Sequence, residues 1–192
     1  MNTHRRRALR LGLTATAALA GVLPRAQAQT WPHKSIRLLV PFAPGGSSEI
    51  VARSAASELT KSLGHTVYVE NKPGAGGNIA MQECAMASDG HTIILGHIGT
   101  LAVNPYIFDK LPFDTHRDFK PISLLAKVPS LYVVNSDVPA KTLKEFVALA
   151  KSRPGKLSYG SAGNGSAGHL AFEYLKMVSD IYVLHVPYRG TG

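Results

Sequence analysis

The most constraining feature of the sequence is a short apolar run that ends in a proline–glycine–serine turn and continues as a helix. Residues 36–40 have the pattern of a buried strand, residues 41–48 form the turn, and residues 50–63 have helical character. A strand, a glycine turn and a helix in this order leave backbone N–H groups unpaired at the helix start, and the helix dipole favours an anion there. The segment therefore predicts either an anion site or an ordinary strand-to-helix turn.

The candidate ligand-binding residues of this first turn are Ala43, Pro44, Gly45, Gly46, Ser47, Ser48 and Glu49. Gly45 and Gly46 lack a Cβ and so allow a ligand to approach the backbone closely. Ser47 and Ser48 can cap the helix or donate through their hydroxyls. Glu49 is unexpected in an anion site. Its carboxylate either interacts with the start of its own helix or accepts a hydrogen bond from a ligand hydroxyl or ammonium group.

The chain repeats this arrangement several times. Further predicted strands at 66–70, 92–96, 157–160 and 182–186 are followed by turns at 71–78, 97–100, 161–169 and 187–192, with helices at 79–87 and 170–177. Two more strands are expected at Ile122–Leu125 and Leu131–Val134, and a helix with a capping box from Thr142 to Glu145 runs to about Lys151. This alternation predicts an α/β fold with largely parallel strands.

The first 28 residues have the pattern of an export signal and not of a folded segment. A basic head containing Arg5, Arg6, Arg7 and Arg10 precedes an apolar run and the small-residue cleavage site Ala26–Ala28. We expect cleavage near Ala28 and a mature, periplasmic chain. Without the signal, 16 basic residues face 12 acidic ones, a net charge of +4 in place of +9. The basic residues are scattered, which argues against nucleic-acid binding and suits an anionic solute.

Three enzyme-like patterns in the chain are incomplete. Residues 163–168 match G-x-G-x-x-G between a strand and a helix, but the strand 182–186 carries no acidic residue to hold a ribose. Neither Ser161 nor Ser166 lies in the G-x-S-x-G pattern of a nucleophile elbow. The histidines and the single cysteine, Cys84, have no metal-ligand spacing. We therefore expect no cofactor, no metal and no enzyme. An oxyanion or phosphate site at Ser161–Gly168 remains the alternative.

Two histidines flank glycine turns and could donate to a ligand. His97 opens the turn that continues to Thr100, and His169 closes the turn that begins at Ser161. We take His97, Thr100 and His169 as further candidate ligand-binding residues.

A set of short motifs, in order along the chain, resembles one known family. The motifs are Trp31-Pro32-x-Lys34-x-Ile36-Arg37, Pro41–Gly46, Val69–Gly77, Ala87-x-Asp89–Thr92, Asn104-Pro105, Leu111–Asp114, Ser161-x-Gly163-x-Gly165-Ser166-x-x-His169-Leu170 and His185–Gly190. Together they are similar to the tripartite tricarboxylate transporter substrate-binding proteins, also called the Bug family. Each motif alone is weak, but the combination covers Trp31 to Gly192.

The resemblance implies a type II periplasmic binding fold, with two α/β domains around a cleft. On this basis residues 1–28 are the signal, 29–125 the first domain, and 126–192 a crossover and an incomplete second domain. The family binds small carboxylates through backbone amides of two facing turns, which correspond here to Ala43–Glu49 and Ser161–Ser166. The second turn adds Ser161, Ala162, Gly163, Asn164, Gly165 and Ser166 to the candidates.

The family also implies membrane permease subunits as partners and a monomeric receptor without a cofactor. The sequence departs from the family in two respects. Glu49 stands where members usually have Asp, and family members are longer than this chain, which we therefore interpret as a truncated member. Exposed edge strands and weakened or absent ligand binding are expected consequences, and a nonfunctional fragment is the remaining alternative.

Overall fold

The computed structural model describes residues 30–190, and the chain from Lys34 onward forms one compact unit. The predicted export signal lies outside the described residues. The elements are β1 (Ile36–Val40), α2 (Ser47–Leu63), β2 (Val67–Asn71), η1 (Ala75–Gly77), α3 (Asn78–Met86), β3 (Thr92–Ile94), η2 (Gly99–Val103), α4 (Asn104–Ile107), α5 (Leu143–Ser152), β4 (Ser158–Ser161), α6 (Ala167–Ser179) and β5 (Leu184–Pro187). In residues 30–190, no helix has the length and apolar character needed to cross a membrane.

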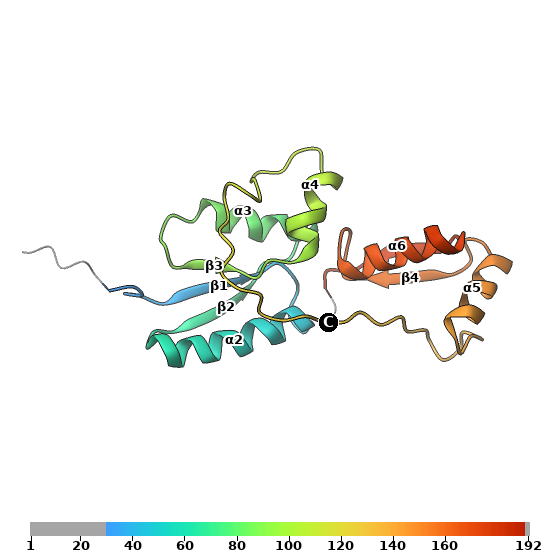
Figure 1. Cartoon of the computed structure of the whole chain (residues 1–192), viewed down its shortest axis with the longest axis horizontal. Helices are drawn as coiled ribbons and strands as arrows, with labels where there is room; N and C mark the ends of the chain where they lie inside the picture. Colours follow the sequence, from blue (N-terminus) through green and yellow to red (C-terminus); the bar gives the residue numbers. More distant parts are fainter. Residues whose placement is uncertain (1–29, 191–192) are drawn as a thin grey trace, which may run out of the picture. The chain divides into compact units, whose positions relative to one another are not determined.

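The first sheet has three parallel strands in the order β2-β1-β3, with β1 in the centre. Figure 1 shows α2 and α3 on opposite sides of this sheet. Ile36, Leu38 and Val40 pack with Ala52 and Ala56 of α2 in one core cluster. Alternate residues of a strand point to opposite faces, so the fully buried Leu39 faces the other side. Burial on both faces explains why β1 is almost continuously apolar.

The strand order places two turns at one point of the sheet. The chain leaves β1 for β2 on one side, and it then returns past β1 to form β3 on the other side. The loops that follow β1 and β3 therefore diverge from adjacent strand ends. In open parallel sheets, ligands bind at such a reversal of strand order, outside the carboxyl ends of the strands.

The second sheet pairs β4 with β5 in parallel. Its core cluster contains Tyr159, Leu175 and Val183, together with Ala150 of α5. The Tyr159 ring stacks on Phe172 of α6 with their centroids 3.8 Å apart. These contacts hold the start of α6 beside the carboxyl end of β4, where the predicted glycine turn lies.

Helix ends follow the sequence signals in some places and depart from them in others. Gly64 caps α2 with a left-handed φ of 67°, as expected of a C-cap glycine. Thr142 is the N-cap of α5 and accepts the Glu145 N–H at 3.2 Å, as predicted. The second half of the predicted capping box differs, because Glu145 Oε2 accepts the Lys141 N–H and not the Thr142 N–H. The start of α2 differs from the prediction because Gly46 is its N-cap, without a side-chain cap, so Ser47 already lies within the helix.

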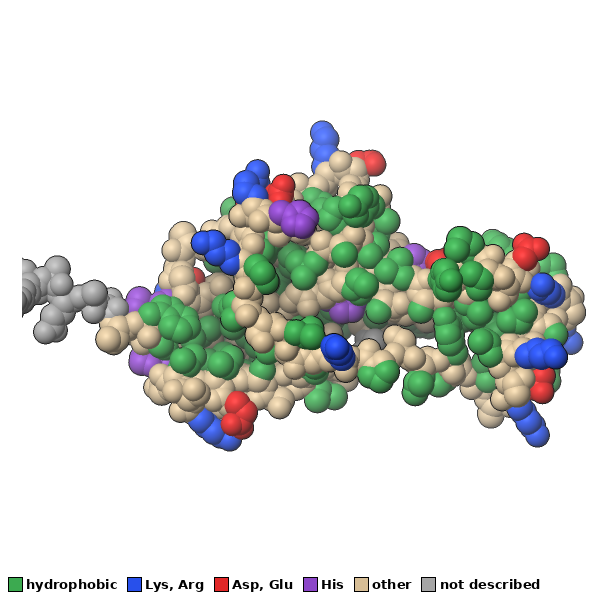
Figure 2. All heavy atoms as spheres, viewed as in Figure 1, with side chains coloured by type: hydrophobic (Ala, Val, Ile, Leu, Met, Phe, Trp, Pro, Cys, Tyr) green, Lys and Arg blue, Asp and Glu red, His purple; other side chains and the backbone are tan. Residues whose placement is uncertain are grey.

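The prediction of strands at Ile122–Leu125 and Leu131–Val134 was wrong. Neither segment has regular structure, and within the described part of the chain neither pairs with another strand. Apolar alternation indicates β-propensity, but a strand exists only where a neighbour completes its hydrogen bonds. Ile122, Leu131 and Val133 are more than 80% exposed. Figure 2 shows hydrophobic side chains gathered in several places on the visible surface.

The central position of β1 gives a stability prediction. Truncation of the fully buried Leu39 to Ala should lower the free energy of unfolding by about 2–5 kcal/mol, because it removes core contacts and leaves a cavity. Ile50→Ala, at an exposed position of α2, should change it by about 0.5 kcal/mol or less. Urea unfolding of both variants measures the difference. Equal losses would contradict the burial of Leu39 in the core.

Candidate functional site

The turns after β1 and β3 meet at the carboxyl edge of the first sheet. The Phe42 ring, two residues after β1, packs edge-on against the imidazole of His97, three residues after β3, with centroids 5.1 Å apart. This contact brings two of the predicted site segments together, as the strand order requires.

The first turn uses only some of its backbone N–H groups internally. The Ala43 N–H donates to the Arg189 carbonyl at 3.0 Å, and the Gly45 N–H donates to Glu49 Oε2 at 2.6 Å. By contrast, Gly46 and Ser48 donate to no acceptor in residues 30–190. These two N–H groups lie at the start of the 17-residue helix α2, where the helix dipole favours negative charge.

Glu49 is buried, and both of its carboxylate oxygens have protein partners. Oε2 accepts the Gly45 N–H, and Oε1 accepts from Arg53 Nε at 2.7 Å and lies 2.5 Å from its Nη2. The Gly45 hydrogen bond, followed by the Arg53 guanidinium, holds the pKa of Glu49 below its usual value. Of the two interpretations of Glu49, these contacts favour interaction with its own helix start. The side chain shapes the turn and its charge is offset by Arg53.

The turn after β3 is held by its own side chains. The His97 Nδ1 accepts the Gly99 N–H at 3.0 Å. The Thr100 hydroxyl is fully buried, accepts the His97 N–H and donates to the His97 carbonyl. Burial lowers the pKa of His97, which favours the neutral ring that this acceptor role requires. Thr100 therefore positions the turn in this structure.

The glycine turn after β4 leads directly into α6. Ser166 is the N-cap of α6, and its buried hydroxyl accepts the His169 N–H at 3.3 Å. The Gly163 N–H donates to Ser161 Oγ at 3.1 Å, and the Gly165 N–H donates to His169 Nδ1, also at 3.1 Å.

Other N–H groups of this turn remain without an acceptor in the part of the chain that is described. They belong to Asn164, Ala167 and Gly168. Ala167 and Gly168 are the first residues of a 13-residue helix, so their N–H groups lie at its positive end. The turn thus repeats the arrangement at the start of α2.

A stack of rings supports this second turn. His169 stacks on His185 with centroids 4.2 Å apart, and His185 stacks on Tyr159 at 4.8 Å. His185 Nε2 lies 2.7 Å from Ser161 Oγ. Burial lowers the pKa of His185. No carboxylate hydrogen-bonds to His185 among the described residues, so the third member of a hydrolytic triad is not seen there.

One close backbone approach joins two predicted site segments, and a second joins one of them to the turn after β5. A Cβ added to Gly99 would lie 2.7 Å from the Gly165 carbonyl oxygen, so the turns after β3 and β4 touch backbone to backbone. A Cβ added to Gly163 would lie 2.9 Å from the Tyr188 carbonyl oxygen. In residues 30–190, no hydrogen bond directly joins Ala43–Glu49 to Ser161–Ser166.

Asn104 is a structural residue of this region that the sequence did not single out as part of the site. It is fully buried, and its Nδ2 donates to the Gly76 carbonyl at 3.0 Å and to Asn78 Oδ1 at 2.6 Å. Its Oδ1 lies against Gly165, where an added Cβ would approach to 3.0 Å. The only available signal was the Asn-Pro pair, which predicts a turn or helix start and gives no contact.

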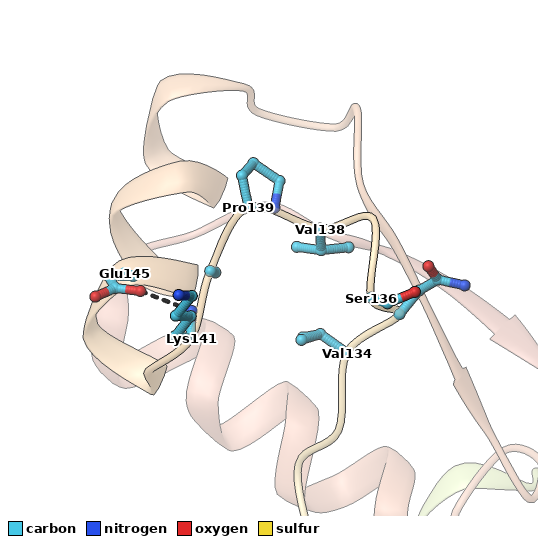
Figure 3. Close-up of a pocket in the computed structure, with 8 residues that line it drawn as sticks. Val134, Ser136, Val138, Pro139, Lys141 and Glu145 are labelled. Carbon is cyan, nitrogen blue, oxygen red and sulfur yellow. Dashed lines mark hydrogen bonds between the residues drawn. The ribbon is translucent and has the colours of Figure 1, made fainter.

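A shallow pocket elsewhere in the chain contains none of the predicted site residues. It lies before α5 and is lined by Val134, Asn135, Ser136, Val138, Pro139, Ala140, Lys141 and Glu145 (Figure 3). The Glu145 carboxylate accepts the Lys141 N–H at 2.6 Å and so belongs to the cap of α5. In residues 30–190, no group of three His, Cys, Asp or Glu side chains is placed to hold a metal ion.

Comparison with known proteins gives the same family as the sequence motifs. The model of the tripartite tricarboxylate transporter family receptor matches residues 51–192. A UPF0065 protein of Bordetella pertussis is 42% identical over 177 residues, which are 92% of this chain and 54% of that protein. The chain thus spans about half the length of this curated relative.

Solved structures share the fold. One is the periplasmic binding protein BugD, with a TM-score of 0.74 and 35% identity over 84% of this chain and 54% of its own. The R. palustris protein Rpa4515, with adipate, has a TM-score of 0.81 and 34% identity over 83% of this chain and 54% of its own. MatC from Rhodopseudomonas palustris, with bound malate, has a TM-score of 0.78 and 35% identity over 83% of this chain and 55% of its own. The predicted α/β periplasmic-binding fold is confirmed, and the chain covers little more than half of each of these structures.

The contacts of Glu49 predict a pH-dependent contribution to stability. Folding lowers the pKa of Glu49, so its ionised carboxylate stabilises the folded state. This stabilisation is present above the pKa of Glu49 in the unfolded chain, about 4.3, and is lost as the pH falls through the pKa of Glu49 in the folded chain. Glu49→Gln should therefore lower the melting temperature at pH 7, and the difference from the wild type should shrink below about pH 4.

Glu58 provides the matched control for this measurement. It lies on the same helix and forms an exposed ion pair with Lys61 at 2.7 Å. Such surface pairs contribute little, so Glu58→Gln should melt close to the wild type at both pH values. A Glu49→Gln variant that behaves like Glu58→Gln would show that the Gly45 and Arg53 contacts do not stabilise the turn.

Proposed function

We propose that this chain, which belongs to the tripartite tricarboxylate transporter receptor family, binds a small carboxylate in the periplasm and delivers it to membrane permease subunits. One observation supports the carboxylate most directly. Two glycine turns lead into helix starts whose N–H groups have no acceptor in residues 30–190, at Gly46 and Ser48 in one turn and at Asn164, Ala167 and Gly168 in the other.

Backbone N–H groups at a helix start bind a carboxylate without a positively charged side chain. Each donates to an oxygen that carries negative charge, and the helix dipole adds a favourable field. The Glu49 charge does not oppose this strongly because Arg53 neutralises it. We assign the ligand contacts to the turns Ala43–Glu49 and Ser161–Ser166, extended to Ala167 and Gly168, with His97 and His169 beside them.

The proposed ligand class is a di- or tricarboxylate or a related organic acid. The similar R. palustris structures contain adipate and malate, and both are dicarboxylates. A backbone site recognises the carboxylate group, and the remainder of the ligand is distinguished by groups around it.

We also propose that the chain is exported and acts as a monomer. The basic head, apolar run and Ala26–Ala28 site predict cleavage that leaves Gln29 as the new N-terminus. The domain limits 29–125 and 126–192 are part of this proposal. Intact-mass measurement of the protein from a Gram-negative periplasm tests the export step, and a chain that retains residues 1–28 would contradict it.

Thermal melting with a carboxylate panel tests the proposed function. The full chain, after export, is melted with and without adipate, malate, citrate and acetate. A ligand that binds only the native state stabilises it by RT ln(1 + [L]/Kd), about 2.7 kcal/mol at a hundredfold excess over Kd. A rise in the melting temperature with one or more di- or tricarboxylates is expected. A cooperative melt that no member of the panel shifts would contradict carboxylate binding.

A proline substitution tests the N–H groups themselves. Ala167 is the first residue of α6 and follows an extended Ser166, so Pro fits there without breaking a helical hydrogen bond. Ala167→Pro removes one unpaired N–H and should weaken carboxylate binding about 10- to 100-fold, the effect of one hydrogen bond to a charged group. The melting temperature without ligand should be preserved. Isothermal titration measures the affinity.

Leu143→Pro is the matched control. Leu143 is the first residue of α5, follows an extended Thr142, and lies outside the glycine turns. The same change at this helix start should leave carboxylate affinity unaltered. Equal effects of the two proline variants, or none with Ala167→Pro, would rule out a carboxylate at the start of α6.

A further inference from the structure

His97 and His169 make the same unusual contact in two different turns. Each ring accepts the N–H of a nearby glycine through Nδ1, Gly99 at 3.0 Å for His97 and Gly165 at 3.1 Å for His169. A neutral imidazole has one N–H and one acceptor nitrogen. A ring that accepts at Nδ1 therefore carries its proton on Nε2 and is uncharged.

The two glycines are themselves in contact and allow no side chain. A Cβ on Gly99 would meet the Gly165 carbonyl oxygen at 2.7 Å, and one on Gly165 would meet Asn104 Oδ1 at 3.0 Å. Gly165 also has a φ of 75°, in the left-handed region that favours glycine. Both glycines are buried, so their N–H groups require an acceptor, and the histidines supply it.

We propose that His97 and His169 are positioning residues. Their Nδ1 atoms fix the backbone of Gly99 and of Gly165, which packs against Gly99, and so set the direction of the N–H groups of Asn164, Ala167 and Gly168 that bind carboxylate. This inference rests on the proposed function. The Gly165 N–H is taken by His169, whereas the adjacent Asn164 N–H and those of Ala167 and Gly168 stay available. The ring thus selects which amides of the turn face a ligand.

Each ring is held in place by neighbours that do not compete for its Nδ1. His97 packs against Phe42, and His169 stacks on His185. Because Nδ1 is occupied, the Nε2–H of each ring is left as a donor. The histidines then carry two functions, an acceptor toward the protein and a donor on the opposite edge of the ring.

The tautomer can be tested without a ligand. In the full chain labelled with ¹⁵N-histidine, NMR at pH 8 should show His97 and His169 protonated on Nε2 and unprotonated on Nδ1. The His97→Asn and His169→Asn variants assign the two signals. Protonation of either ring on Nδ1 would overturn the proposal, since that nitrogen could not accept the glycine N–H.

Affinity measurements test the effect on the turns. Asn places Oδ1 close to the position of histidine Nδ1 and keeps the acceptor, whereas Ala removes it. His97→Ala and His169→Ala should each weaken binding of adipate or malate about tenfold or more, and the Asn variants should return to within about threefold of the wild type. His65 lies after the end of α2, and its Nδ1 contacts the Leu63 carbonyl. The His65→Ala variant should bind like the wild type.

Each outcome of this comparison has a definite meaning. Ala variants that bind like the wild type, or Asn variants as weak as Ala, would overturn the positioning role. If an Ala variant fails to melt cooperatively, the Asn variant and a Gln variant, which moves the acceptor away from Nδ1, give the comparison in its place. A wild type that binds no carboxylate would refute the proposed function, and with it the proposed effect of the two histidines on affinity. The NMR result would still decide whether His97 and His169 accept the N–H groups of Gly99 and Gly165.

Discussion

The parallel pairing of β1 with both of its neighbours is the constraint on which the candidate site depends. Parallel strands bring their carboxyl ends to one edge, so every turn that leaves the sheet begins there. In the order β2-β1-β3, the connections after β1 and β3 diverge, but both begin at adjacent strand ends. The contact of Phe42 with His97 joins the two connections near those ends. The β4–β5 pair repeats the rule with the turn at Ser161. Catalytic side chains are not needed to make such an edge chemically distinctive, because helix starts supply polar N–H groups.

Internal hydrogen bonds decide which of those N–H groups are available. A count from the sequence alone treats every amide of a glycine turn as unpaired. In the structure, Gly45 donates to Glu49, Gly163 to Ser161 and Gly165 to His169. These internal hydrogen bonds remove three N–H groups from the set that a ligand could contact. The groups that remain belong to Gly46 and Ser48 at the start of α2 and to Asn164, Ala167 and Gly168 at and before the start of α6, where water or an anion can serve as acceptor.

The sequence predicted the parts of the fold that short-range chemistry determines. Gly64 marks the end of α2 because a left-handed residue is needed there, and Thr142 marks the start of α5 because its hydroxyl replaces a missing helical acceptor. The strands expected around Ile122 and Leu131 failed because pairing is a property of two segments, and a pattern within one of them cannot show whether the other is present. The structural roles of Thr100 and Asn104 could not be predicted from the sequence, because both depend on contacts that local propensity does not encode.

Side chains that accept hydrogen bonds shape this site more than side chains that donate them. An anion site built from backbone N–H groups has donors in excess, and its specificity requires that some of them point elsewhere. Glu49 removes Gly45 from the available set in the first turn, and His169 removes Gly165 in the second. The two acceptors differ in charge. A carboxylate side chain repels an anion unless a positive charge neutralises it, and Arg53 neutralises Glu49. A neutral imidazole carries no negative charge to neutralise. The first turn thus depends on an ion pair and the second on an imidazole acceptor, although both leave N–H groups of a helix start without an acceptor in residues 30–190.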